Sequence, residues 1–172
     1  LFRLDKGNAM NADPVTGGVE GSSDKQRNQG LELSAGGVIL PGWNVTATYA
    51  LYDSSTTASS TAANLGKNIP YVPHNQATFW SAYNAFASKP YNFLIGGGVT
   101  WRQHVWLNAA NTLRVPANVD FSAVISHRFD EHWKISMNGY NLANRLNYQS
   151  LFSNRATPST GRMFIGEVKY TY

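Results

Sequence analysis

Apolar and polar residues alternate with a period of two along most of this chain. The last stretch, 162–172, shows it clearly, because Phe164, Val168 and Tyr170 recur on one face while Glu167 and Lys169 fall on the other. Successive side chains of a strand point to opposite faces, so this alternation predicts strands. We predict no helix, and one short strand followed by seven full strands: 1–6, 27–40, 43–53, 75–86, 91–104, 117–129, 133–140 and 162–172.

The connections between these strands alternate strictly in length. Tight turns are expected at 41–42, 87–90 and 130–132. In an up-and-down meander every long connection then lies at one end of the sheet, which is typical of transmembrane barrels. The strand lengths also suit a tilted membrane crossing of about 9–11 residues. The long connections, which are rich in Gly, Asn, Ser, Thr and Pro, are expected at 7–26, 54–74, 105–116 and 141–161.

Aromatic residues gather beside the tight turns and at the chain end. In a barrel they would form a girdle at the periplasmic interface. Alternation by itself does not say whether the apolar face meets lipid or a protein core, and a soluble β-sandwich could bury the same residues. The aromatic residues concerned are Trp43, Tyr91, Phe129, Trp133 and Tyr172.

Composition excludes several classes of function. Apolar residues make up 42% and charged residues 14%, yet no apolar run approaches the about 18 residues of a membrane helix. The chain has no cysteine, and its net charge of +4 carries no Lys/Arg cluster, so we expect no thiolate metal site and no nucleic-acid partner. No Ser/His/Asp arrangement or His-x-x-x-His pair occurs, and the Gly96-Gly97-Gly98 run lies within a strand, where it would ease curvature or close packing. We therefore expect an all-β protein with no catalytic residue, resident metal or cofactor.

Several motifs in order resemble the carboxy-terminal barrel portion of a TonB-dependent siderophore receptor. The match extends from RNQGLELSAGGVILPGWNVTATYALYD (27–53) to GRMFIGEVKYTY (161–172). Among receptors of this family, the pattern is closest to those for ferric catecholate-like complexes. The departures are Asn144, where an acidic residue is usual, and Tyr172, where Phe is usual. The residues that carry the resemblance are Arg27, Gly30, Glu32, Gly42, Trp43, Pro73, His74, Trp80, Tyr83, Asn141, Leu142, Gly161 and Arg162.

The resemblance implies an antiparallel up-and-down transmembrane β-barrel of about 22 strands with a plugged lumen. Residues 1–172 would be the carboxy-terminal part of that barrel domain, about its last eight strands. We accordingly expect the chain, which starts without Met, to be a piece of a longer protein, with the plug and the TonB-contacting segment upstream of Leu1.

The function implied is outer-membrane uptake of a ferric siderophore with energy from TonB and no covalent chemistry. Expected partners are the ferric siderophore as substrate, TonB, outer-membrane lipid and lipopolysaccharide, and the barrel assembly machinery. The resemblance also implies that the terminal strand carries the assembly signal, formed by Phe164, Val168, Tyr170 and Tyr172.

Basic and aromatic side chains near the long connections are candidate substrate contacts, because a ferric catecholate is anionic and aromatic. The alternative is that they bind lipopolysaccharide phosphates, pair with loop acids or are simply solvated. The candidates are Arg102, His104 and Trp106 after one strand, and Arg145, Tyr148 and Arg155 in the last long connection.

Charged residues on the polar faces are expected to form ladders of opposite charge across neighbouring strands. His127 is expected on the apolar face near an interface. Other functions stay open: a small self-contained eight-stranded outer-membrane barrel with a structural or adhesive role, a soluble carbohydrate-binding β-sandwich, and a passive porin, to which the motifs do not point. The residues of the expected ladders are Glu32, Asp120, Arg128, Lys134, Glu167 and Lys169.

Overall fold

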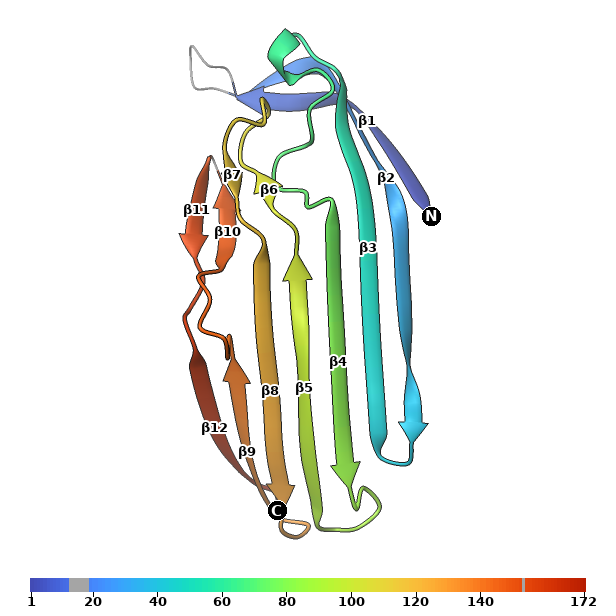
Figure 1. Cartoon of the computed structure of the whole chain (residues 1–172), viewed down its shortest axis with the longest axis vertical. Coiled ribbons are helices and arrows are strands. Elements are labelled where there is room, and N and C mark those ends of the chain that lie inside the picture. Colours follow the sequence, from blue (N-terminus) through green and yellow to red (C-terminus); the bar gives the residue numbers. More distant parts are fainter. Residues whose placement is uncertain (13–18, 153) are drawn as a thin grey trace.

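One antiparallel sheet of eight strands dominates the computed structural model, which describes residues 1–12, 19–152 and 154–172. The strands are arranged in the order β1-β2-β3-β4-β5-β8-β9-β12, so each strand of this sheet pairs with the strand that follows it along the chain (Figure 1). The bounds are β1 Phe2–Ala12, β2 Val19–Leu40, β3 Trp43–Ala58, β4 Asn75–Ala85, β5 Asn92–Arg102, β8 Asn118–Arg128, β9 Trp133–Tyr140 and β12 Met163–Tyr170.

Two small hairpins and a single 3-10 turn lie at the end of the sheet where the long connections gather (Figure 1). No helix in the part of the chain that the structure describes is long and apolar enough to cross a membrane. The hairpins are β6 Val105–Trp106 with β7 Arg114–Val115 and β10 Tyr148–Phe152 with β11 Arg155–Pro158, and the 3-10 turn η1 is Ala62–Asn64.

From the turn at residues 41–42 onward, the predicted alternation of short and long connections is confirmed, and so are the tight turns at residues 41–42, 87–90 and 130–132 (Figure 1). At the first of these turns Gly42 has φ +82°, a left-handed conformation that L side chains rarely adopt. The strand predicted at 133–140 has those bounds, and β4, β5 and β8 differ from prediction by at most two residues at either end. The lengths of these strands could be predicted because the alternation of apolar and polar residues marks where side chains alternate between two environments.

The predicted long connection over residues 7–26 is wrong. β1 continues to Ala12 and β2 begins at Val19, so most of that stretch is a hairpin; residues 13–18 lie outside the described residues. Arg27 donates to the Asp5 carboxylate at 2.8 Å across this hairpin, and Arg3 donates to it at 2.9 Å. Strand ladders are made by backbone groups, so polar residues can extend a hairpin into water without a hydrophobic face. The expected six-residue strand at the start of the chain is likewise too short, since β1 has 11 residues.

The other long connections are also more ordered than their composition suggests. β3 runs on to Ala58 instead of ending at residue 53, and the connections predicted at 105–116 and 141–161 contain the two small hairpins. Residue 153 lies outside the described residues. These elements depend on hydrogen bonds between connections. They have no hydrophobic periodicity from which the sequence could predict them.

Large apolar side chains of the sheet are exposed on one face. Phe79, Ile95 and Met137 are 46%, 52% and 52% exposed, although all three lie on strands that are paired on both sides. Among the described residues only Ala50, Val105, Leu107 and Val115 are buried hydrophobic residues. A water-soluble sandwich would bury such side chains between two sheets, whereas lipid solvates them. The arrangement therefore favours a lipid-facing surface and disfavours the soluble sandwich.

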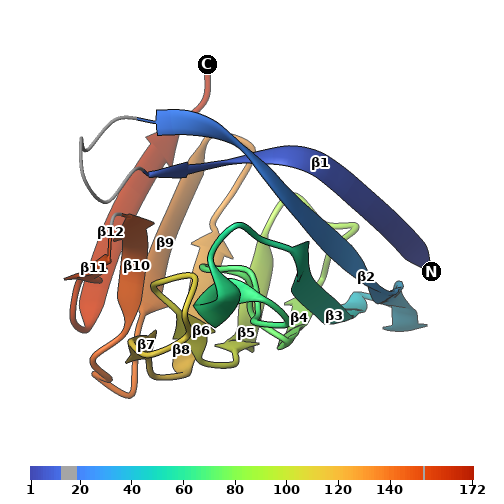
Figure 2. The ribbon, with the colours of Figure 1, turned by 90° about the horizontal axis from the view of Figure 1, so that it is seen from above.

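The sheet curves into an open trough, and the outer half of the β1–β2 hairpin runs across its open side (Figure 2). β1 and β12 are the two edges of the sheet, and no pairing between them joins the described strands into a closed barrel. The small self-contained eight-stranded barrel is thus not what the chain forms. Close packing expected at the glycine run is confirmed, since a Cβ at Gly98 would overlap the Phe79 carbonyl oxygen and the Trp80 ring.

Candidate functional site

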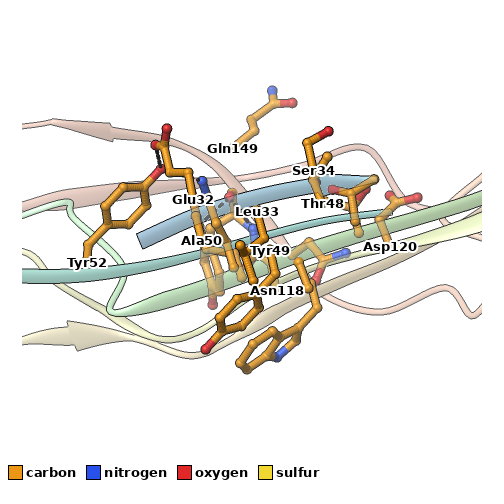
Figure 3. Close-up of a pocket in the computed structure, with 18 of the residues that line it drawn as sticks. Glu32, Leu33, Ser34, Thr48, Tyr49, Ala50, Tyr52, Asn118, Asp120 and Gln149 are labelled. Atoms are coloured by element: carbon orange, nitrogen blue, oxygen red, sulfur yellow. Dashed lines mark hydrogen bonds between the residues drawn. The ribbon is translucent and has the colours of Figure 1, made fainter. Parts of the chain in front are cut away.

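A cavity of about 630 Å³ lies on the polar face of the sheet towards the long connections (Figure 3). Its volume is within the range of small-molecule sites, about 300–1,000 Å³. Figure 3 shows Ser34, Thr48 and Asp120 pointing to one side of the strands and Tyr49 to the other. The polar lining residues are Glu32, Ser34, Thr48, Tyr52, Gln76, Thr78, Thr100, Arg102, Asn118, Asp120, Asn147, Tyr148, Gln149 and Ser159.

Strand register places these side chains in two rows across the sheet. Because each strand pairs directly with the next, residues at the same height on the same face become neighbours. One row runs from Glu32 through Ala50, Gln76 and Arg102 to Asn118, and the next runs from Ser34 through Thr48, Thr78 and Thr100 to Asp120.

Arg102 and Tyr148 lie in contact at the edge of this cavity. The Arg102 Nη2 donates to the Tyr148 main-chain carbonyl oxygen at 3.2 Å, and the Asn118 Nδ2 donates to the same oxygen at 2.6 Å. The Nε of Arg102 is buried and has no hydrogen-bond partner. The side chains of Arg102 and Asn118 thus tie the start of β10 to the end of β5 and to the start of β8.

Both carboxylates of the cavity accept hydrogen bonds from neighbouring hydroxyl groups. Tyr52 donates to Glu32 Oε1 at 2.8 Å, and Ser122 donates to Asp120 Oδ1 at 2.7 Å. Gln76 Nε2 donates in turn to the Tyr52 hydroxyl at 3.2 Å. Each carboxylate is held in place by these bonds, which fixes negative charge at two points of the lining.

The long connections form one packed layer beyond the cavity. Val105, Leu107 and Val115 are buried together, and Tyr148, Leu151 and Ala156 of the last connection pack against them. Main-chain bonds join the layer further, because the N–H of Tyr71 donates to the carbonyl oxygen of Trp106 at 2.8 Å. This layer is the only hydrophobic core cluster among the described residues, so the connections support one another.

The predicted contact residues are brought together only in part. Arg102 and Tyr148 line the cavity. His104 and Trp106 form an edge-to-face pair with centroids 5.8 Å apart at the β6 hairpin, and neither lines the cavity. Arg145 and Arg155 are exposed and outside its lining. The role of these six residues as substrate contacts stays a prediction.

Tyr52, Gln76, Asn118, Asn147 and Gln149 line the cavity but were not predicted. Tyr52 and Gln76 could have been found, because continuing the alternation past Leu51 and back from Ala77 places both on the polar face. Asn147 could not, since it enters through the fold of a long connection.

Ladders of opposite charge, expected on the polar face, are not what the register gives. Arg128 on β8 lies opposite Lys134 on β9, and Lys134 lies opposite Lys169 on β12. Glu167 lies opposite Ser136. The described residues contain two ion pairs, Arg3–Asp5 and Arg27–Asp5, and neither is in this region. Charge signs cannot be paired from sequence until the register between strands is known.

A second hollow of about 310 Å³ adjoins this row and is lined by Arg128, Asp130, Glu131, His132, Trp133, Lys134, Lys169 and Thr171.

Aromatic side chains cluster near the chain end on the apolar face. Tyr170 lies 4.8 Å from Trp133 and 5.1 Å from Tyr172, measured between ring centroids. His127, on the same face as predicted, packs edge-to-face on Phe129 at 4.4 Å. Of the predicted assembly signal, Phe164 and Val168 are 60% and 68% exposed on this face. No group of three or more His, Asp or Glu side chains suited to a metal ion occurs within the described ranges.

Comparison with known proteins identifies the family. The family model "TonB dependent receptor-like, beta-barrel" matches residues 1–142. The probable TonB-dependent siderophore receptor PiuA of Acinetobacter baumannii is 27% identical over the whole chain, which covers 24% of that protein. Its crystal structure superposes with a TM-score of 0.82 over 99% of this chain, at 25% identity and covering 25% of that structure.

Two further relatives match a smaller part of this chain. The catecholate siderophore receptor Fiu of Escherichia coli is 25% identical over 83% of this chain and 19% of that protein. The ferrioxamine receptor of Yersinia enterocolitica is 33% identical over 54% of this chain and 12% of that protein. The chain thus spans at most about a quarter of the length of these relatives. With more than four fifths of its residues matched by the family model, the chain belongs to the family of TonB-dependent receptor β-barrels.

Proposed function

We propose that this chain is part of the barrel wall of an outer-membrane receptor that takes up ferric siderophore complexes with energy delivered through TonB. The observation that carries the proposal is the two-sided sheet of this family member. Its apolar face is exposed, as lipid contact requires, and its polar face holds a cavity beside the packed long connections.

The relatives support iron complexes as the substrate class. Their names cover catecholate complexes and ferrioxamine, so the proposal extends to ferric siderophores as a class. The chemistry is binding and translocation without a covalent step and without a resident cofactor. Lipid and lipopolysaccharide surround the apolar face, and the terminal strand is recognised by the barrel assembly machinery.

The test is uptake of radioactive iron by intact, iron-limited cells. Deleting the gene should abolish uptake of at least one ferric siderophore, and a plasmid copy should restore it. Loss of TonB in the complemented strain should abolish uptake again. Unchanged uptake of every complex offered after deletion would contradict the proposal, as would uptake that persists without TonB.

A further inference from the structure

The cavity between the polar face of the sheet and the long connections carries more negative than positive charge. Glu32 and Asp120 both line it, and among the described residues of its lining Arg102 is the only cation. This contrasts with the chain as a whole, whose net charge is +4. The sign of charge around the cavity is therefore a local property of the site.

The single cation of the lining already makes a hydrogen bond to the protein. Arg102 donates through Nη2 to the Tyr148 carbonyl oxygen at 3.2 Å, and its Nε is buried. Other basic residues of the long connections, among them Arg114, Arg145 and Arg155, are exposed and outside the lining. An anion in the cavity would meet two fixed carboxylates and one arginine that is already engaged.

The rest of the polar lining consists of neutral hydrogen-bonding groups. Hydroxyls come from Ser34, Thr48, Thr78 and Thr100, and amides from Gln76, Asn118, Asn147 and Gln149. Such groups can donate to or accept from a neutral ligand rich in amide and hydroxamate oxygens. They offer no compensation for a ligand with a large negative charge.

The net charge of a ferric siderophore is the sum of the charges of the ferric ion and of its ligand groups. Three singly charged hydroxamates cancel the charge of the ferric ion, and a protonated amine makes the complex cationic. Three doubly charged catecholates leave a trianion. Like charge placed close to fixed carboxylates is disfavoured, and more strongly where water is partly excluded.

We infer that this cavity selects neutral or cationic ferric complexes of the hydroxamate type and disfavours trianionic tricatecholates. The inference rests on the proposed function and narrows the charge class of its substrate. It differs from the catecholate-like expectation drawn from the sequence motifs, because the motifs reflect the family whereas the cavity charge depends on which side chains the register brings together.

The experiment measures binding by quenching of tryptophan fluorescence in the whole receptor, purified in detergent. The probes are ferrioxamine B, a cationic ferric trihydroxamate, and a ferric complex of a tripodal tricatecholamide. We expect the trihydroxamate to bind at least about tenfold more tightly. The variant Glu32→Gln/Asp120→Asn should bind the trihydroxamate about tenfold more weakly and the tricatecholate more tightly. The ratio of the two affinities should therefore fall.

Two further variants separate charge from folding. Glu131→Gln/Glu167→Gln removes the same charge from residues outside the cavity lining and should leave both affinities unchanged. Thr78→Lys keeps both carboxylates but adds a cation to the lining, and should shift the preference towards the tricatecholate.

Tighter binding of the tricatecholate by the unaltered receptor overturns this inference alone. So do equal changes of both affinities in Glu32→Gln/Asp120→Asn. Binding of neither complex, together with no iron uptake in cells, overturns the inference and the proposed function together.

Discussion

The Arg102 guanidinium and the Tyr148 carbonyl oxygen are joined by a hydrogen bond of 3.2 Å that links residues 46 positions apart in the chain. Both residues were candidate substrate contacts, yet here one positions the other. A hydrogen bond from a charged group to a carbonyl oxygen contributes about 1.5–3 kcal/mol. Changes at Arg102 should therefore act on the last long connection as well as on any ligand.

Replacing Arg102 with Ala should loosen the connection between β9 and β12. We expect cleavage within residues 141–162 by externally added protease, on intact cells, to become several-fold faster. Asn118→Ala should have a similar effect, because Asn118 donates to the same oxygen. Arg145→Ala, an exposed arginine in the same connection, is the matched control and should leave cleavage unchanged; equal cleavage in all three variants would contradict the positioning role.

Asn147 should be among the residues on which the long connections depend most. Its side chain is 4% exposed, accepts from the Val119 N–H at 3.1 Å and donates to the Val119 carbonyl oxygen at 2.8 Å. Asn147→Ala leaves two main-chain groups unpaired, each costing about 1–3 kcal/mol. We expect a melting temperature several degrees lower in detergent, whereas Gln149→Ala, which removes an exposed amide nearby, should leave it within error.

Removing the central cation of the row at the turn end should stabilise the barrel. Lys134 lies directly between Arg128 and Lys169, and like charges directly opposite each other destabilise a sheet by about 0.2–1 kcal/mol per pair. Lys134→Gln should raise the melting temperature at low salt, and the gain should shrink as salt screens the repulsion. Lys89→Gln, an exposed lysine at the same end, should show no such salt-dependent gain.

Tyr170 should be needed for efficient assembly of the barrel. Its ring contacts Trp133, Tyr172 and His132, with centroids 4.8, 5.1 and 5.8 Å away. Tyr170→Ala removes all three contacts, and we expect a several-fold lower level of folded, heat-modifiable receptor in outer-membrane fractions. Thr171→Ala, on the other face, keeps the main-chain bond to His132 and should assemble normally. Equal levels for both variants would show that the terminal aromatic residues are not recognised.

The tight turn between β8 and β9 should weaken in acid. The pKa of the Asp130 carboxyl lies below its ordinary value because the backbone N–H groups of Trp133 and His132 donate to it, each at 2.8 Å. A carboxyl with a lowered folded-state pKa stabilises the turn above the unfolded pKa, and that stability is lost as the pH falls through the folded value. Protection of the Trp133 amide from hydrogen exchange should decline over that acidic range, and Asp130→Asn should remove this pH dependence. A wild-type profile identical to that of the variant would contradict the assignment.

The central strands of the sheet, the faces of their side chains and the end at which the connections are short could be predicted from the amino-acid sequence. These follow from local physical rules, because period-two alternation reports two environments and Pro and Gly mark turns. The strand at 133–140 and the apolar face of the terminal strand were predicted in this way. The motifs added the family, which the comparisons confirmed.

The environment of the apolar face, the pairing of charges and the lining of the cavity depend on how the strands assemble and could not be predicted from the sequence. Phe79 and Met137 would alternate identically in a buried sandwich, and only the absence of a facing layer in the described chain leaves them exposed. The row of Arg128, Lys134 and Lys169 depends on register between strands, and Asn147 reaches the cavity through a connection with no period of its own. Contacts between residues far apart in the chain leave no local pattern, so the charge of the site could be known only once the sheet was assembled.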